Sequence, residues 1–281
     1  MVATPIGNLC DITLRALHVL GLADTIACED TRHTRLLLRA YGIDKGAGQL
    51  LALHQHNEAE AARSVVDRLH AGQRVAYVSD AGTPGVSDPG ARLAASVQAH
   101  GLRSIPLPGA SSITALLSVA GCAMDTGATS GFVFFGFLPS KAAERATAVA
   151  TLAQEARAVV LLEAPHRIGA LAQALAALGP RQLTVGRELT KQFEEIATLA
   201  AADFPAWAAA DANRQRGEFV LALHAAPVDS GASDVPRVLE LLLSELPLKS
   251  AVRIAAEITG QPRNVLYARA LELKKSDPGD A

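Results

Sequence analysis

The chain has 281 residues, 49% of them hydrophobic, and this length exceeds that of a typical single domain. Its formal net charge of −2 excludes a global basic field, so any contact with a polyanion must come from a local patch. The three cysteines lack metal spacing, no apolar run is long enough for a membrane span, and no export signal opens the sequence. These features predict a protein of the cytoplasm, with no membrane partner.

Strand and helix signals alternate over residues 1–120, which predicts an N-terminal α/β domain with parallel strands joined by crossover helices. The chain begins almost inside a first strand at Val2, and we expect this strand to be slightly truncated. Further strands are expected at residues 25–29, 50–54, 74–79 and 103–109, and helices at 31–42, 58–72, 91–101 and 111–121. Residues 121–131 are rich in glycine and small polar side chains, which predicts an interdomain linker.

A second α/β domain with some antiparallel pairing is expected over residues 121–226. Its strands are expected at residues 132–137, 157–163, 181–189, 192–199 and 217–225, and its helices near 140–155, 165–178 and 199–212. A second linker is expected at residues 226–236. Residues 235–281 carry three helical segments joined by short turns, which predicts a small helix-turn-helix-like domain. Six basic residues against two acidic ones between Leu248 and Lys275 give this segment the one clear positive bias.

Four stretches with turn-forming and polar residues follow expected strands. They are residues 2–13, 28–38, 78–90 and 106–115. In open α/β sheets, ligands bind beyond the carboxyl ends of the strands, so these stretches are expected to form one site. Each stretch taken alone also fits an ordinary turn or a helix cap.

The stretch VSDAGTPGVSDPG, residues 78–90, is the most contorted of the four. The spacing of Gly82, Gly85 and Gly90 misses the dinucleotide fingerprint, and no Gly-Lys-Ser/Thr follows, so a phosphate cradle is disfavoured. Glycines let the backbone approach a ligand and prolines limit its alternatives. Exposed amides and carbonyls suit a ligand that carries both an ammonium and a carboxylate, and a tight turn without a ligand is the alternative.

Charged residues gather at other strand ends. Arg32, His33 and Arg35 crowd the start of a helix that Asp30 or Thr31 can cap. Cations there oppose the helix dipole, so helix stability alone would not select them. A rim that meets phosphate and a solvated helix face stay open as equal alternatives.

The expected second domain has its own charged strand ends. Glu163, His166 and Arg167 follow one strand, and Arg187, Glu188 and Lys191 follow another. Solvated strand ends are again the alternative to a functional site.

Two kinds of chemistry have no support in the sequence. No histidine–carboxylate cluster has metal-ligand spacing, and His54 and His56 share a strand face without a third ligand, so no metal site is predicted. No G-x-S-x-G elbow occurs, so serine hydrolysis is not predicted.

The motifs together resemble those of the tetrapyrrole-methylase superfamily of S-adenosylmethionine-dependent methyltransferases. They are TPIGNL, EDTRHT, HNE, SDAGTP, SDPG, PLPG, GFLP, HR, RELTK, LPLK and NVLY, in this order over nearly the whole chain. EDTRHT combined with SDAGTP is similar to the branch that 2′-O-methylates a cytidine in the decoding region of 16S rRNA.

The resemblance implies a two-domain α/β fold that is not of the Rossmann type, with S-adenosylmethionine in the cleft between domains and a helical domain at the C-terminus. It also implies a homodimer that acts on 16S rRNA or the small ribosomal subunit. By position, the cofactor-binding residues are Pro5, Asp80, Gly82, Thr83, Val86, Ser111, Ser112 and Leu162, with Glu163 and the GEFVL strand on the second domain's side. This sequence reads PGASS where related sequences often differ, which makes Ser111 and Ser112 the weaker part of the match.

Methyl transfer to a ribose hydroxyl calls for a base or a polarising cation, because the neutral hydroxyl is a poor nucleophile. Glu29 and Asp30 are the candidate bases, with Glu163 behind them. Lys191, Arg32 and His33 are candidates to steady a phosphate or a developing alkoxide.

RNA is expected to contact basic residues at the cleft and in the C-terminal helices, mainly through phosphate and shape, because the chain has few aromatic residues. The RNA-binding candidates are Arg32, His33, Arg35, Arg167, Lys249, Arg253, Arg263 and Arg269, with Lys191 also at the cleft. Two alternatives stay open: a corrinoid or tetrapyrrole methylase of the same fold, and a non-catalytic RNA-binding assembly factor.

Overall fold

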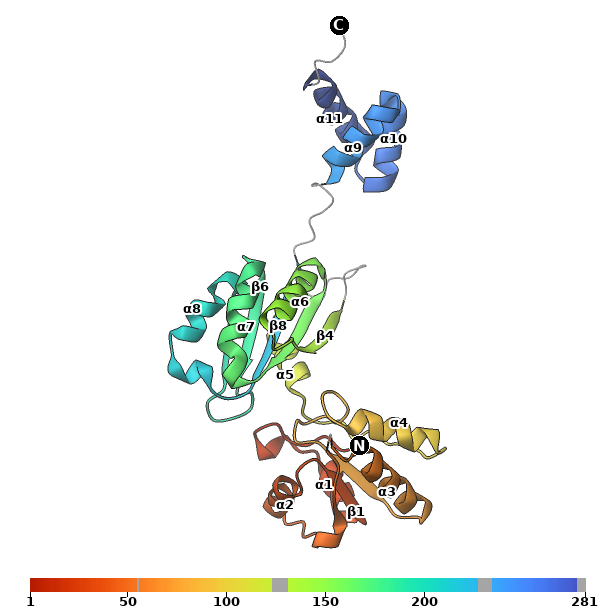
Figure 1. Ribbon diagram of the computed structural model, residues 1–281, viewed down its shortest axis with the longest axis vertical. Helices are drawn as coiled ribbons and strands as arrows, with labels where there is room; N and C mark the ends of the chain where they lie inside the picture. The colour runs from red at the N-terminus through yellow and green to blue at the C-terminus, as the bar shows by residue number, and fades with distance from the viewer. Residues whose placement is uncertain (55, 123–130, 227–233, 277–281) are drawn as a thin grey trace. The chain divides into compact units, whose positions relative to one another are not determined.

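The computed structural model describes residues 1–54, 56–122, 131–226 and 234–276. The chain divides into two compact units, Met1–Ala226 and Pro227–Ala281 (Figure 1). Most of each predicted linker, at residues 121–131 and 226–236, lies outside the described residues. The first unit contains two sheets, which we assign to an N-terminal lobe (residues 1–111) and a central lobe (residues 112–226). The predicted α/β class is confirmed.

The N-terminal lobe is a parallel sheet of order β2-β1-β3 covered by helices on both faces. Its elements are α1 (Leu14–Leu22), β1 (Thr25–Cys28), α2 (Thr31–Ala40), β2 (Leu50–Ala52), α3 (Glu58–His70), β3 (Val75–Val78) and α4 (Gly90–Ala99). Alternation along β1 separates the two cores: Ile26 and Cys28 pack with α1 and α2, whereas Ala27 packs with α3 and α4. All four β1 residues are buried, as expected of a central parallel strand.

Two predictions for this lobe were incomplete or wrong. The strands expected at Val2 and over residues 103–109 are single bridged positions, with Val2 paired in parallel to both Val78 and Leu107. Pro106 and Pro108 flank Leu107 and cannot donate backbone hydrogen bonds, so a longer ladder does not form. Helix α1 had no sequence prediction, although the side chain of Thr13 caps it by accepting a hydrogen bond from the backbone N–H of Ala16.

The central lobe has a mixed sheet of order β4-β5-β8-β6-β7, in which only β4 and β5 are parallel. Its elements are α5 (Ser112–Val119), β4 (Phe132–Phe137), α6 (Ala142–Gln154), β5 (Ala158–Glu163), α7 (Ile168–Leu175), β6 (Gln182–Arg187), β7 (Glu195–Ala200), α8 (Phe204–Ala209) and β8 (Phe219–Leu223). The predicted antiparallel pairing is confirmed. The helix expected near residues 199–212 is wrong in extent, because β7 runs to Ala200 and only the short α8 follows.

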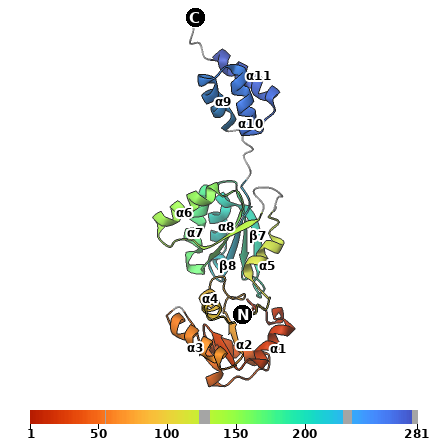
Figure 2. The same ribbon diagram turned by 90° about the vertical axis from the view of Figure 1, so that its right-hand side faces the viewer.

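Helix α5 sets the boundary between the lobes. Helices α6, α7 and α8 cover one face of the central sheet, and α5 covers the other (Figure 2). Leu116 of α5 shares a core with Val160 of β5 and Val220 of β8. The predicted domain boundary at residue 120 is therefore misplaced by one helix, because the apolar face of α5 is buried on the second sheet.

The second unit contains three helices, in agreement with the predicted helical domain at residues 235–281. They are α9 (Asp234–Glu245), α10 (Leu248–Thr259) and α11 (Arg263–Ser276). Its core holds Leu239, Val252 and Leu266, one from each helix. Gly260 ends α10 with φ of 67°, a left-handed conformation that glycine adopts without a side-chain clash. Short 3-10 turns elsewhere in the chain occupy Leu9–Asp11, Ala47–Gln49, Pro165–Arg167, Ala176–Leu178, Ala201–Asp203 and Ala212–Gln215.

Candidate functional site

A cavity of about 460 Å³ lies in the unit Met1–Ala226, lined by residues of both lobes. The N-terminal lobe supplies Ile6, Glu29, Asp80, Ala81 and Ser87, and the central lobe supplies Ser112, Phe137, Leu162, Glu163, Ala164, Pro165, Leu189, Glu218, Phe219 and Val220. This lining combines an apolar wall with four carboxylates and contains no Lys, Arg or His among the described residues. Such a cavity suits an organic ligand that carries positive charge.

Strand ends place the carboxylates. Glu29 follows β1, Asp80 follows β3, and Glu163 is the last residue of β5. Each of the four N-terminal stretches that the sequence analysis expects to form one site contributes to this lining, through Ile6, Glu29, Asp80 and Ser112. Five of the predicted site residues line the cavity together: Glu29, Asp80, Ser112, Leu162 and Glu163.

Hydrogen bonds fix the start of the glycine-rich loop beneath the cavity. Glu29 Oε1 accepts hydrogen bonds from Ser79 Oγ at 3.0 Å and from the Asp80 backbone N–H at 3.3 Å. Thr4 Oγ1 donates to the carbonyl of Ser79 at 2.8 Å, which joins this loop to the N-terminal turn. The backbone of residues 79–82 is therefore held in place before any ligand binds.

Burial changes the acidity of the carboxylates in this lining. Burial raises the pKa of Glu29, although the hydrogen bonds from Ser79 and Asp80 act in the opposite direction. Burial also raises the pKa of Asp80, against the attraction of His33. The buried carboxylate of Glu163 has a charged partner, because Oε1 lies 3.0 Å from Arg167 Nε.

Two of the predicted cofactor-binding residues do not line the cavity but contact residues near it. They are Gly82 and Thr83. Gly82 has φ of 90°, and a Cβ atom there would lie 2.6 Å from Ile6 Cγ2. Thr83 Oγ1 donates to the Ala110 carbonyl at 2.9 Å, joining the glycine-rich loop to the stretch before α5. Both residues thus position neighbours of the cavity.

The other three predicted cofactor-binding residues are also outside this lining. Pro5 precedes Ile6, and Val86 is 38% exposed beside Ser87. Ser111 lines a second hollow of about 380 Å³, which shares Ile6 with the first.

Two residues predicted as catalytic have other partners. Asp30 caps α2 through the Arg32 backbone N–H and forms an ion pair with the Arg32 side chain at 2.9 Å. Those hydrogen bonds lower the pKa of Asp30 to about 2. Lys191 Nζ lies 2.9 Å from Glu188 Oε1 and 3.1 Å from Glu218 Oε2. Neither Asp30 nor Lys191 lines the cavity.

Sequence reasoning missed several lining residues, chiefly apolar ones. Ile6, Phe137 and Leu189 lie within or beside the motifs TPIGNL, GFLP and RELTK, yet their residue types resemble core positions. Glu218, Phe219 and Val220 belong to the GEFVL strand, which was expected to line the pocket. The sequence pointed to these apolar residues only through the polar residues of the motifs in or beside which they lie.

The predicted RNA-binding residues differ in their accessibility. Arg32 and His33 are exposed at the start of α2, whereas Arg35 is half-buried. Arg167 is largely enclosed, because it contacts Glu163 and donates to the Leu138 carbonyl.

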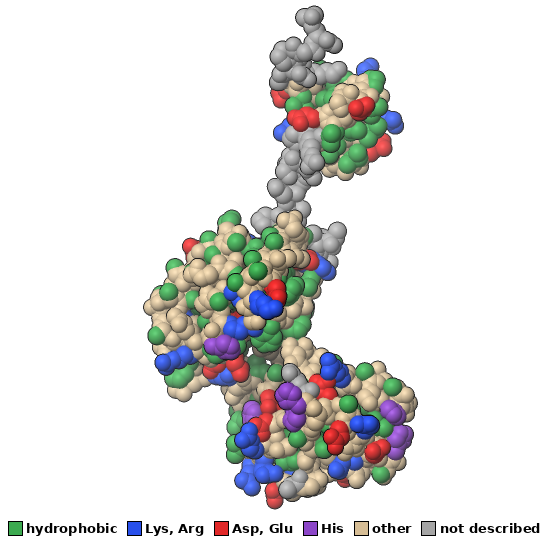
Figure 3. All heavy atoms as spheres, in the orientation of Figure 1, with side chains coloured by type: hydrophobic (Ala, Val, Ile, Leu, Met, Phe, Trp, Pro, Cys, Tyr) green, Lys and Arg blue, Asp and Glu red, His purple; other side chains and the backbone are tan. Residues whose placement is uncertain are grey.

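The four basic residues predicted in the second unit, Lys249, Arg253, Arg263 and Arg269, are all exposed. Arg263 lies 3.9 Å from Glu257. On the face in Figure 3, basic side chains of this unit are interspersed with acidic and hydrophobic ones.

Two features are absent from the described residues. No cluster of His, Cys, Asp or Glu with the geometry of a metal site occurs in that part of the chain. None of the helices within the described ranges has the length and hydropathy needed to cross a membrane.

Both units of the chain match known protein families. Residues 1–205 match the tetrapyrrole (corrin/porphyrin) methylases, and residues 229–274 match the RsmI C-terminal HTH domain. The chain is 44% identical over 281 residues to ribosomal RNA small subunit methyltransferase I of Pseudomonas aeruginosa, covering 97% of this chain and 96% of that protein. It is 46% identical over 278 residues to the protein of the same name from Neisseria meningitidis, covering 98% and 93%.

A solved structure agrees on the fold. Uroporphyrin-III-C-methyltransferase from Thermus thermophilus superposes with a TM-score of 0.54 at 21% sequence identity, covering 79% of this chain and 91% of that one. At this identity the likeness concerns the fold alone.

Proposed function

The chain belongs to the tetrapyrrole (corrin/porphyrin) methylase family, and from this premise we propose that it uses S-adenosylmethionine to methylate the 2′-hydroxyl of a cytidine in the decoding region of 16S rRNA. The observation that carries the proposal is the cavity of about 460 Å³ with four carboxylates and no basic residue in its described lining. The relatives' printed names support rRNA as the substrate, and the motifs EDTRHT and SDAGTP support the choice of nucleotide.

The residues of the cavity fit S-adenosylmethionine. This cofactor carries a sulfonium and an ammonium, and Glu29 and Asp80 supply negative charge. Glu163 and Glu218 also line the cavity, each in an ion pair, with Arg167 and Lys191 respectively. Leu162 and Val220 offer apolar surface for its adenine, and the cavity volume lies within the range of small-molecule sites. A phosphate-rich ligand would meet repulsion at the same carboxylates.

The bound cofactor supplies an activated methyl group, and the protein contributes alignment and exclusion of water. Apolar residues from both lobes, Ile6 and Leu189 among them, form part of the cavity wall. The hydrogen bonds of Glu29 to Ser79 and Asp80 hold the loop rigid, so little ordering remains when the ligands bind. Such preorganisation contributes on the order of several kcal/mol to the lowering of a barrier.

RNA contacts are assigned to basic residues outside the cavity. Arg32 at the start of α2 is exposed although it is paired with Asp30, and Lys249, Arg253 and Arg269 in the second unit are exposed. Arg167 and Lys191 already have acidic partners and would act on RNA only after exchanging them.

A homodimer in the cytoplasm is part of the proposal. Phe132 and Phe135 are 39% and 40% exposed on β4, an edge strand of the central sheet, and Phe137 of the same strand lines the cavity. Exposed aromatic residues on an edge strand are unusual for a monomer and fit an interface between copies. Light scattering coupled to gel filtration tests this part, and a monomer at micromolar concentration would remove it.

The direct test of the function is transfer of a tritiated methyl group to small ribosomal subunits and to naked 16S rRNA. Label in RNA, recovered in an alkali-resistant dinucleotide, is the expected result, because 2′-O-methylation blocks hydrolysis at that position. Label in a corrinoid or porphyrin instead would favour the small-molecule alternative. Calorimetry with S-adenosylmethionine separates the remaining alternative, since a non-catalytic assembly factor has no need to bind it.

A further inference from the structure

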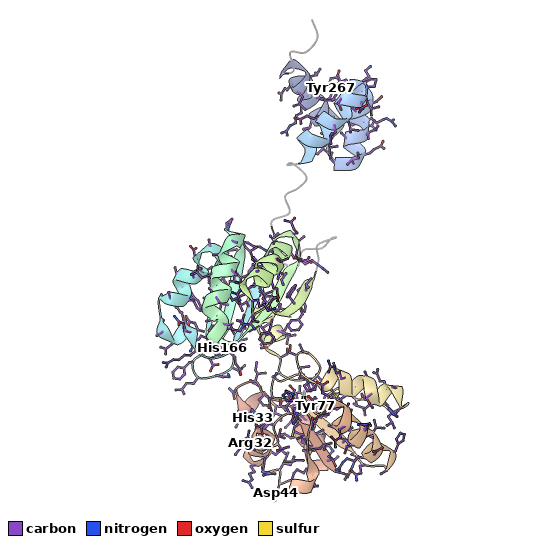
Figure 4. All side chains as sticks on the ribbon, in the orientation of Figure 1. Arg32, His33, Asp44, Tyr77, His166 and Tyr267 are labelled. Atoms are coloured by element: carbon purple, nitrogen blue, oxygen red, sulfur yellow. The ribbon has the colours of Figure 1, made fainter. Side chains whose placement is uncertain are left out.

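His33 lies beside the cavity, in the first turn of α2. Its Nδ1 is 3.4 Å from Oδ1 of Asp80, and Asp80 lines the cavity. The His33 side chain is 61% exposed, so a large substrate can reach it, while the partner carboxylate extends into the pocket. Figure 4 labels His33 and Arg32 at the start of α2, and His166 on the central lobe.

We propose, on the basis of the proposed function, that His33 is the general base that accepts the proton of the ribose 2′-hydroxyl and that Asp80 is the residue that positions its ring. A carboxylate facing Nδ1 favours the tautomer with hydrogen on Nδ1, which leaves the lone pair of Nε2 available. No partner for Nε2 is found among the described residues. A spacing of 3.4 Å is longer than a good hydrogen bond, and such contacts commonly shorten when substrate binds.

The hydroxyl proton moves to Nε2 of His33 as the 2′-oxygen forms a bond to the methyl carbon. The bond between that carbon and the sulfonium sulfur breaks, and its electron pair stays on sulfur as a neutral thioether. The imidazolium is left facing Asp80, whose negative charge stabilises it. The proton then passes to solvent, because the ring is exposed.

The neighbouring charged groups are less suited to accept the proton. Glu29 Oε1 holds the glycine-rich loop through two hydrogen bonds, and Asp30 is engaged by Arg32. Glu163 is buried against Arg167. Asp80 is thus the carboxylate in contact with His33. Asp30 and Arg32, at the start of the same helix, are paired with each other.

The test compares the native chain with His33→Gln, Asp80→Asn and His166→Gln. His166 is a matched control because it is exposed beside the cavity residue Pro165, with no carboxylate recorded next to it among the described residues. Single-turnover methylation at saturating RNA is expected to fall at least about 100-fold in His33→Gln and to stay within about threefold of native in His166→Gln. RNA and cofactor affinities of His33→Gln are expected to stay within about twofold of native.

A second readout needs no turnover. In ¹⁵N-labelled protein at pH 8, His33 is expected to show the Nδ1–H tautomer, and Asp80→Asn is expected to shift the ring to the Nε2–H form. Full-rate methylation by His33→Gln, or a defect confined to RNA affinity, would overturn the proposal. If the native chain fails to methylate ribosomal RNA, the proposed function fails instead, and the tautomer experiment still reports whether Asp80 holds the ring.

Discussion

The buried carboxyl of Glu29 lowers the stability of the fold when it is ionised. Its folded-state pKa lies above the ordinary value of 4.5, chiefly because the carboxyl is buried. The ionised form therefore weakens the fold at neutral pH, and this destabilisation disappears as the pH falls through the folded-state pKa to below 4.5. A carboxylate kept charged at such a cost fits a role toward a cationic ligand.

We expect Glu29→Gln to raise the melting temperature at pH 7 and to weaken S-adenosylmethionine binding. Glutamine keeps an oxygen that can accept from Ser79 and Asp80, but it lacks the charge. A contact to a charged group contributes about 1.5–3 kcal/mol, so the Kd should rise about ten- to a hundredfold. Thermal melts at pH 7 and pH 4 with calorimetry measure both effects, and the stability difference should shrink at pH 4. Glu240→Gln, exposed in the middle of α9, should change neither quantity.

At the level of elements, the glycine-rich loop after β3 depends on two positive-φ glycines in different ways. A Cβ on Gly82 would lie 2.6 Å from Ile6 Cγ2 and 2.8 Å from the Ala110 carbonyl oxygen. The nearest atom to a Cβ on Gly85 is 3.8 Å away. Their φ values of 90° and 88° are nearly equal, so the pair separates backbone strain from steric overlap.

Gly85→Ala should lower the free energy of unfolding by about 1–2 kcal/mol through strain alone. Gly82→Ala should lower it by a further ~1–3 kcal/mol, because Ile6 and Ala110 must move. Urea unfolding measures both, and calorimetry should show weaker cofactor binding for Gly82→Ala because Ile6 lines the cavity. Equal destabilisation of the two variants would mean that the close packing around Gly82 is unimportant.

These elements also show what the sequence can reveal. Apolar runs bounded by turn residues located β1, β3 and β5, and the polar residues after them located Glu29, Asp80 and Glu163 in the cavity. For Glu29 and Asp80 the rule works because β1 and β3 are parallel neighbours whose carboxyl ends meet at one edge, whereas Glu163 ends β5 of the other sheet and lines the cavity from the central lobe.

Contacts between residues that are distant in the sequence were harder to predict. Lys191, between β6 and β7, pairs with Glu218, the residue before β8, and Leu189 of the same motif lines the cavity although its residue type suggests core. Helix α5 was assigned to the wrong sheet for a similar reason, because its apolar pattern fits a buried face of either sheet.

For the molecule as a whole, attraction to a large polyanionic substrate depends on the basic residues of the second unit. The chain is slightly acidic overall, and the cavity lining is acidic, so attraction to RNA must come from elsewhere. Lys249, Arg253, Arg263 and Arg269 are exposed on α10 and α11, and Arg263 is only loosely paired with Glu257. We infer that they contribute affinity without base selectivity, since phosphate contacts carry no sequence information.

Replacing these four residues by alanine in the full chain should weaken RNA binding and leave S-adenosylmethionine binding unchanged. For every phosphate that the variant no longer neutralises, the slope of log Kd against log salt should decrease by about 0.7–0.9. Fluorescence anisotropy over a salt series measures the slope, and calorimetry measures cofactor binding. The matched control replaces four exposed arginines of the first unit, Arg15, Arg63, Arg103 and Arg216. An equal decrease of RNA affinity in both variants would mean that net charge, rather than the second unit, governs RNA binding.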